Sequence, residues 1–331
     1  MSPAARRTVK KSRSSPKRRI SKKLVIIAAP VITAFLVASS VTYALHHTKK
    51  AAPVTRKPQS TTKNTTVSPL AQVSQGTMQP LTGTSSGLHT DAGLAQIVNS
   101  WQQSHSFTAS IVVQELSGSL RTAGSNASAS MIPASTYKIY VAYAILHGIE
   151  QGSYSLGTVT SDGNTIQTDL NNMILNSDND AARTLGFLYG WKNINALLQS
   201  QGMNNTDLYN YVPPSTQPVG DKHTTANDLA TAVQKLYAVK LLNSTNTQLL
   251  ISLMKQQHYR ERIPAGVPSN IAVADKPGWL SPADGESGYT ENDAGIVYGP
   301  KSTYLLVIMT NGSSTQPLAT LSQQVYSYLE N

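Results

Sequence analysis

The sequence predicts an α+β domain whose sheet combines strands from both ends of the domain around a helical middle. Strand-like apolar runs occur early, over 107–116, and late, over 304–309. Between them, apolar residues recur three and four positions apart, as they do on one face of a helix. Residues 46–87 have few large apolar residues to support a core, so the folded domain is expected over 88–331.

The first expected elements are one helix and two strands. A helix is predicted where apolar residues recur at helical spacing from Leu94 to Trp101. Strands are predicted over 107–116 and 120–123. The residues between them, 117–119, read Ser-Gly-Ser, a composition that favours a turn.

Helices dominate the middle of the domain, and strands return at its end. The expected elements are a helix opened by Ser135, helices over 179–189, 191–201, 225–239 and 245–256, strands over 271–274, 293–298 and 304–309, and a last amphipathic helix carrying Leu318, Leu321, Val325 and Leu329.

The charge of the chain is unevenly distributed. Of the formal net charge of +10, residues 1–90 contribute fifteen Lys and Arg with no Asp or Glu. Residues 91–331 hold twelve Lys and Arg against seventeen acids. The basic charge therefore belongs to a tail and not to a folded surface, so we expect no nucleic-acid partner.

The tail contains a predicted membrane anchor. A basic cytoplasmic segment, 1–23, precedes an uncharged stretch, 24–45, which is long enough to cross a bilayer at about 1.5 Å per residue. The positive flank indicates that the N-terminus stays inside and that 24–45 lies in the lipid bilayer. The alternative is a cleavable signal peptide, but its apolar core would be shorter, about 7–15 residues, and would precede a small-x-small site.

A linker rich in Thr, Ser and Pro, 46–87, is expected to be solvated and to connect the anchor to the domain. The domain itself is expected outside the cytoplasm. Its lack of cysteine fits an exported domain large enough to fold without disulfides. The histidines have no close paired spacing, so neither a metal nor an organic cofactor is expected.

Three short motifs indicate chemistry. They read Ser135-Thr136-Tyr137-Lys138, Ser177-Asp178-Asn179 and Lys276-Pro277-Gly278. The pattern Ser-x-x-Lys also begins at Ser14, Ser60 and Ser252, but only Ser135 follows a Pro-Ala step and opens an apolar helical run. A serine at a helix start presents its hydroxyl and its unpaired N–H, and a lysine three positions later lies one turn away.

In this order and context the motifs resemble those of class A β-lactamases and the related penicillin-binding DD-peptidases. The resemblance covers 88–331 and includes the run Ala265-Gly266-Val267-Pro268. It implies a β-lactamase/transpeptidase-like fold, with an antiparallel sheet built from both ends of the domain and an all-helical lobe. A single N-terminal transmembrane helix would precede that domain.

The resemblance assigns three catalytic residues. Ser135 would attack a carbonyl, which an unaided serine hydroxyl does poorly at neutral pH. Lys138 would be the base, because burial and a second cation both favour a neutral amine. Ser177 would relay a proton to the departing nitrogen. The alternative for Ser177 is a purely structural role in capping the helix that follows, since Ser and Asp are favoured caps.

Further residues would bind substrate. Asn179 would bond the substrate amide or hold Lys138, and Lys276 would be the second cation unless it is simply a solvated strand end. The lysine motif continues through Gly278 to Trp279, whose N–H the resemblance pairs with that of Ser135 as donors to the oxyanion. Arg262 would hold a substrate carboxylate, or is simply an exposed arginine beside Glu261.

Departures from the family pattern concern deacylation. Class A β-lactamases carry a loop glutamate in a Glu-x-x-Leu-Asn sequence, but residues 204–221 contain no Glu. Asn210 is a possible match for the loop asparagine, and Asp207 is a possible replacement for the missing base. Pro277 stands where the family has a hydroxyl residue. We therefore expect acylation to outrun deacylation.

The sequence leaves the substrate open between β-lactams and the D-alanyl stem peptides of peptidoglycan. The predicted function is a membrane-anchored serine hydrolase that forms an acyl-enzyme with β-lactams and releases it slowly. One alternative is a D-alanyl-D-alanine carboxypeptidase or transpeptidase. An alternative of another class is a catalytically weak module that binds the cell wall or β-lactams.

Overall fold

The computed structural model describes residues 87–208, 222–281 and 289–331. The predicted cytoplasmic tail, anchor and almost all of the linker, as well as Asn210, lie outside these ranges. Among the described helices, none combines the length and the apolar character that a bilayer crossing requires.

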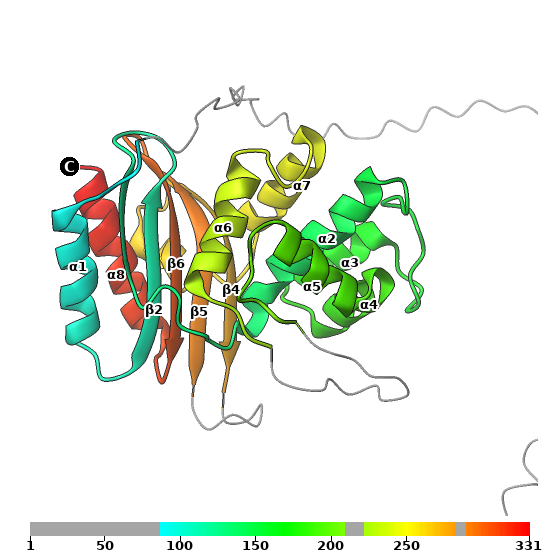
Figure 1. Ribbon diagram of the computed structural model, residues 1–331, viewed down its shortest axis with the longest axis horizontal. Helices are drawn as coiled ribbons and strands as arrows, with labels where there is room; N and C mark the ends of the chain where they lie inside the picture. The colour runs from blue at the N-terminus through cyan, green and yellow to red at the C-terminus, as the bar shows by residue number, and fades with distance from the viewer. Residues whose placement is uncertain (1–86, 209–221, 282–288) are drawn as a thin grey trace, which may run out of the picture. The chain divides into compact units, whose positions relative to one another are not determined.

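The described elements alternate much as the sequence predicts (Figure 1). In chain order they are β1 (His89–Thr90), α1 (Ala92–Gln103), β2 (Thr108–Glu115), β3 (Arg121–Ser125), the 3₁₀ turn η1 (Ala134–Tyr137), α2 (Lys138–Glu150), α3 (Ile166–Leu175), α4 (Asn179–Tyr189), α5 (Trp191–Ser200), α6 (Ala226–Tyr237), α7 (Ser244–Lys255), the 3₁₀ turn η2 (Ile263–Gly266), β4 (Ala272–Leu280), β5 (Thr290–Tyr298), β6 (Thr303–Asn311) and α8 (Thr315–Leu329).

The strands form one sheet in the order β1-β3-β2-β6-β5-β4. Strand β2, from the start of the domain, pairs with β6, from its end, so the predicted combination of both ends is confirmed. The pairs among β2 to β6 are antiparallel. The expectation of a wholly antiparallel sheet is wrong at one edge, because the two-residue β1 runs parallel to β3.

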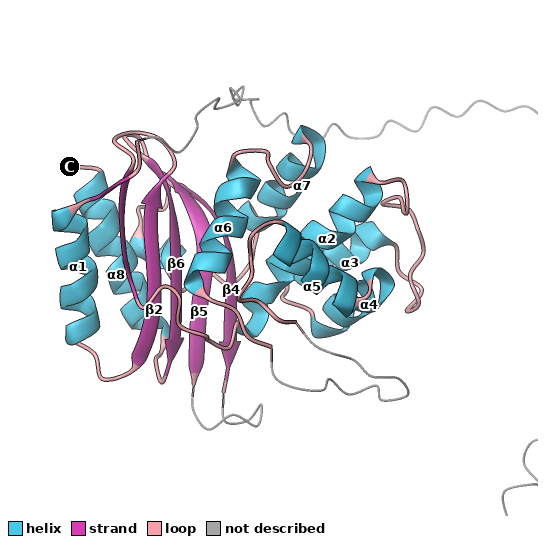
Figure 2. Ribbon diagram, viewed as in Figure 1, coloured by secondary structure: helices cyan, strands magenta, loops and turns pink. Residues whose placement is uncertain are grey.

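Both faces of the sheet are covered by helices (Figure 2). Along β6, Leu305 and Val307 pack in the core shared with the helical lobe, whereas Leu306 and Ile308 pack in the core beneath α1 and α8. A strand buried on both faces reads as a continuous apolar run, which is how 304–309 reads.

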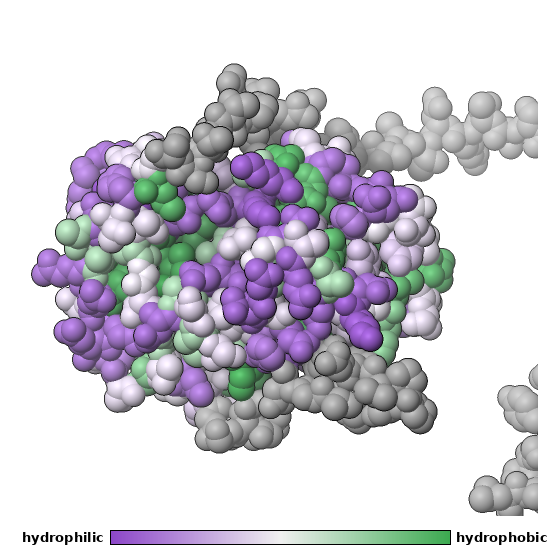
Figure 3. Space-filling model, in the orientation of Figure 1, coloured by the Kyte–Doolittle hydropathy of each residue, from purple (hydrophilic) through white to green (hydrophobic). Residues whose placement is uncertain are grey.

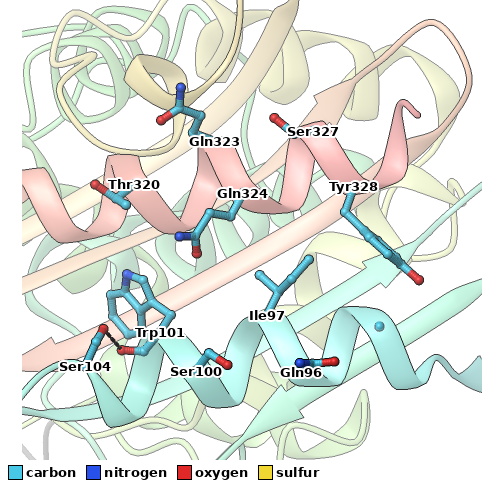
Figure 4. A pocket seen from close by; sticks show the side chains of 11 residues that line it. Gln96, Ile97, Ser100, Trp101, Ser104, Thr320, Gln323, Gln324, Ser327 and Tyr328 are labelled. Carbon is cyan, nitrogen blue, oxygen red and sulfur yellow. Dashed lines mark hydrogen bonds between the residues drawn. The ribbon is translucent and has the colours of Figure 1, made fainter.

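Helices α1 and α8 cover one face and are fastened to each other. The Trp101 indole N–H donates to the carbonyl of Pro317 at 2.9 Å. The Tyr328 hydroxyl donates to Asp91 at 2.7 Å, and Asp91 also caps α1 through the N–H of Leu94. A groove of about 820 Å³ lies between the two helices (Figure 4). It lies on the opposite side of the sheet from the three motifs.

On the other face, α2 is the central helix of the helical lobe. Its residues from Ile139 to Leu146 are all buried, as expected for a helix that is apolar all round. Helix α3 was not among the predicted elements, because the polar pair Asn171 and Asn172 weakens its helical signal. Capping by Thr165 and burial of its apolar face stabilise it.

Polar side chains cover most of the domain face seen in Figure 3.

Strand β4 extends beyond its predicted end at residue 274. It continues through the lysine motif to Leu280, with Pro277 opposite Asp293. A proline has no N–H for a ladder and is therefore tolerated mainly on edge strands. Because β4 is an edge strand, its free side faces the Ser135 segment, which sets up the site.

Candidate active site

Ser135 lies in η1, immediately before α2. The preceding residue, Ala134, has a φ of +46°, in the left-handed region that non-glycine residues rarely adopt. A Cβ placed on Gly278 of β4 would lie 2.5 Å from the Ser135 nitrogen. Only a glycine at 278 therefore lets β4 come this close to the nucleophile segment.

Lys138 is completely buried and contacts Ser135 directly. Its Nζ lies 3.0 Å from Ser135 Oγ, 2.6 Å from the Ser177 carbonyl oxygen and 2.7 Å from Asn179 Oδ1. The last two are acceptors only, so each takes one N–H. A neutral amine has two N–H bonds and one lone pair, which leaves the lone pair for the hydroxyl of Ser135.

Burial supports this neutral state. It lowers the pKa of Lys138 to about 7, and the nearby Asp178 carboxylate opposes the shift. A base is most effective when its pKa lies near the working pH. Lys138 Nζ thus lies in contact with Ser135 Oγ, where a neutral amine can accept the hydroxyl proton.

Ser177 connects the two lysines. Its Oγ lies 3.2 Å from Lys138 Nζ and accepts a bond from Lys276 Nζ at 3.0 Å. Its φ is +56°, again in the left-handed region. The capping role belongs to Asp178, whose carboxylate accepts bonds from the N–H groups of Asp180 and Ala181 at the start of α4. Capping and the orientation of Ser177 therefore occur together.

Lys276 is fully buried, so it is not a solvated strand end. Besides Ser177, its Nζ donates to the carbonyl of Pro277 at 2.9 Å. Burial lowers the pKa of Lys276 to about 7, and the neighbouring Lys138 contributes in the same direction. The structure thus brings together Ser135, Lys138, Ser177, Asn179, Lys276 and Gly278, as predicted from the motifs.

Arg262 lies apart from this group and is not an exposed arginine. The whole residue is 4% exposed, and its guanidinium donates two hydrogen bonds to Glu291, at 2.5 and 2.7 Å. It also lies 5.0 Å from the centre of the Trp279 ring, and Tyr259 contacts that ring at 4.8 Å. Arg262 therefore packs over the Trp279 ring, with its charge already paired to Glu291.

Asp207 is likewise engaged elsewhere. Its carboxylate accepts a bond from the Asn195 amide of α5, and its backbone pairs with His223. It lines a polar groove with Lys192. None of its described bonds reaches Ser135 or Lys138.

A buried carboxyl pair lies behind Lys276 and was not predicted from the sequence. Asp275 and Asp293 are both fully buried, on the face of the sheet opposite Lys276. Asp275 accepts a bond from Arg260 at 2.5 Å, and Asp293 accepts the N–H of Ile263 at 3.0 Å. Burial and the proximity of Asp293 raise the pKa of Asp275, and burial raises the pKa of Asp293 to about 6. The signal available was only the position of an acid beside the motif lysine.

A second feature missed from the sequence is the contact of segment 258–259 with the Ser177 turn. The His258 ring lies 2.8 Å from Asn176 Oδ1, and the Tyr259 hydroxyl donates to the Asn176 carbonyl at 3.4 Å. Tyr259 also contacts Trp279. These contacts connect the serine of the second motif to the end of β4.

A sequence model of the beta-lactamase enzyme family matches residues 92–329. No curated protein sequence matches the chain.

Several solved structures share the fold. The structure of PBP-A is 22% identical, with a TM-score of 0.63, over 73% of this chain and 98% of that one. A mutant of PBP-A, in an acyl-enzyme complex with penicillin G, is 21% identical with a TM-score of 0.64 over 73% and 98%. The TLA-3 extended-spectrum β-lactamase is 16% identical with a TM-score of 0.64, over 72% and 99%.

Proposed function

The chain belongs to the beta-lactamase enzyme family, as its motifs predicted, and is a serine hydrolase acting on amide bonds; from this we propose that Ser135 is its nucleophile and that it forms a slowly hydrolysed acyl-enzyme. The observation that carries the proposal is the continuous contact from Ser135 Oγ through Lys138 Nζ and Ser177 Oγ to Lys276 Nζ. A nucleophile in contact with a neutral base is the arrangement that covalent catalysis by serine requires.

Acylation then proceeds in two steps. Ser135 Oγ forms a bond to the substrate carbonyl carbon while its proton passes to the lone pair of Lys138 and the carbonyl π electrons move onto oxygen. The oxyanion is held by the N–H groups of Ser135 and Trp279. When it collapses, the C–N bond breaks, and the departing nitrogen takes the Ser177 proton, which Lys138 or Lys276 replaces.

Deacylation is the weak step in this proposal. It needs a base that deprotonates a positioned water, an effect typically worth about 10²–10⁴-fold. The described residues before the 209–221 segment, Asn204 to Leu208, contain no Glu, and the Asp207 carboxylate is bonded to Asn195. The acyl-enzyme should therefore persist.

We propose that the substrate is a β-lactam, with D-alanyl peptides of peptidoglycan as the second candidate. The PBP-A mutant of the same fold, solved as an acyl-enzyme with penicillin G, supports the first. The missing loop glutamate favours the second. Arg262 would act on either substrate indirectly, by holding Trp279.

We also propose that 24–45 anchors the chain in the membrane and that 46–87 places the domain outside the cytoplasm.

A pulse of penicillin followed by intact-protein mass spectrometry tests the proposal. We expect one adduct on the full chain that decays slowly, and no adduct on Ser135→Ala. Ser252→Ala is the matched control, because it removes the serine of a second Ser-x-x-Lys sequence on exposed α7 positions and should label normally. The absence of any adduct on the wild type would favour a binding module.

The same experiment separates the roles in deacylation. A transient adduct with turnover at about 10 s⁻¹ or faster, typical of enzymes, would contradict slow deacylation. Asp207→Asn should leave the adduct lifetime unchanged, because Asp207 faces Asn195. A longer lifetime in that variant would instead identify Asp207 as the base.

A further inference from the structure

A third lysine, Lys222, lies close to the site and is not part of any of the three motifs. Its backbone position is fixed by two short pairings that follow it. His223 and Asp207 exchange backbone hydrogen bonds at 3.0 Å. Thr224 and Met131 exchange them at 3.0 and 2.8 Å. The chain at Lys222 is thereby held against the segment that leads into Ser135.

Lys222 and Lys138 both place their Nζ atoms near the ring of Tyr137. Lys222 Nζ lies 4.1 Å from the centre of the Tyr137 ring, and Lys138 Nζ lies 5.9 Å from the same centre. The two nitrogens can be no farther apart than these two distances combined. The upper limit on the separation of Lys138 and Lys276 is smaller, because both contact Ser177 Oγ, at 3.2 and 3.0 Å.

Lys138 and Lys276 are fully buried and Lys222 is half-buried. Three amines in such a group do not all carry protons easily at neutral pH, because burial and like charge both oppose the ammonium form. Burial lowers the pKa of Lys222 to about 7, and Lys138 adds to the shift. On the Lys138 side, Asp178 favours the charged form. On the Lys276 side, Asp275 and Asp293 do the same from the other face of β4.

We propose that Lys222 is a positioning residue for acylation: it competes with Lys138 for protons, and whenever it is protonated it favours the neutral form of Lys138 that accepts the Ser135 proton. The catalytic consequence rests on the proposed function, in which Lys138 is the base. The electrostatic coupling between Lys222 and Lys138 does not, and it can be measured without a substrate.

The first test follows the ¹³Cε chemical shift of Lys138 with pH in the full chain, with Lys138→Arg used to assign the resonance. In Lys222→Met the titration midpoint of Lys138 should rise by about one pH unit, the shift expected for a unit charge near 10 Å at an effective dielectric constant of about 20. In Lys222→Arg, which keeps a permanent cation, the midpoint should stay at or below the wild-type value.

Lys192→Met is the matched control. Lys192 is an exposed lysine of α5 that lines the same groove as His223, so its removal changes the net charge equally at a nearby position. It should leave the Lys138 midpoint in place. An unchanged midpoint in Lys222→Met, or an equal rise in Lys192→Met or Lys222→Arg, would overturn the inference.

The second test measures the acylation rate by a fluorescent penicillin against pH. In Lys222→Met the acidic limb of the rate profile should shift to higher pH. At a pH below the wild-type midpoint, the acylation rate should then fall up to about tenfold. A Lys138 midpoint that moves while the rate profile stays fixed would leave the coupling intact and overturn the role of Lys138 as base in the proposed function.

Discussion

At the scale of single residues, Ser177 shows how the backbone and the chemistry of the site depend on each other. Its φ of +56° is unfavourable for any residue with a Cβ. That conformation lets its carbonyl and its hydroxyl both face Lys138 while its hydroxyl also meets Lys276. A strained backbone conformation of this kind persists only where the surrounding contacts hold the residue in place, which is common at functional sites.

Two substitutions at this position separate the conformation from the hydroxyl. Ser177→Ala and Ser177→Gly both remove the proton relay, so each should slow penicillin acylation by roughly 10²–10⁴-fold. Ser177→Gly should have the higher melting temperature of the two, because glycine tolerates positive φ. A wild-type acylation rate in either variant would show that the hydroxyl does not relay the proton.

At the scale of elements, the site depends on how closely the edge strand β4 approaches η1. Three backbone atoms of the Ser135 segment lie within 3.0 Å of the position that a Cβ on Gly278 would take. The approach is possible because no described strand lies beyond β4 on that side. The helical lobe and the sheet thus meet at a contact that has no space for a side chain.

Gly278→Ala should push β4 away from Ser135. Overpacking of this kind typically costs about 1–3 kcal/mol of stability, and acylation should fall more than the loss of folded protein explains. Urea unfolding and penicillin labelling measure the two effects. Gly157→Ala is the control, since Gly157 is exposed and its Cβ would meet nothing closer than 3.9 Å. Equal labelling of the two variants would contradict the close approach.

At the scale of the whole molecule, the buried charges make stability depend on pH in two opposite ways. Asp293 has a pKa raised to about 6, against about 3.9 in the unfolded chain. The folded protein then holds more protons between these values, so stability falls as pH rises through that window. The lysines with a pKa lowered to about 7 hold fewer protons when folded, so their effect is a gain in stability above pH 7.

Asp293→Asn isolates the acidic window. The wild type should lose on the order of 2 kcal/mol of unfolding free energy between about pH 4 and pH 6, and the variant should lose less. Urea unfolding at several pH values measures this. The rise above pH 7 should remain in the variant, because the lysines are unchanged. An identical decline in both proteins would place the titrating group elsewhere.

The predicted arrangement in the membrane is tested on whole cells. The basic segment 1–23 should stay in the cytoplasm, because positive flanks resist translocation. Protease added outside intact cells should therefore digest residues 88–331. Protection of the domain, under conditions in which a known outside protein is cut, would contradict the proposed localisation.

Sequence by itself determined the α+β class, most of the elements and the three motifs. These depend on local information: apolar periodicity, capping and turn residues, and the spacing of Ser135 and Lys138 within one helical turn. Where local signals conflicted, prediction failed. Polar residues weakened the helical pattern of α3, so it was not predicted. The proline and glycine of the lysine motif are unfavourable in strands, so β4 was predicted to end too early.

Tertiary structure alone decided which charged groups belong to the site. Arg262 is paired with Glu291, and Asp207 with Asn195, while Lys222 and Lys138 both lie near the Tyr137 ring. The partners in each case are separated in sequence by loops or by whole elements. The energy of a charge depends on its burial and on its neighbours, and a linear sequence specifies neither before the chain folds.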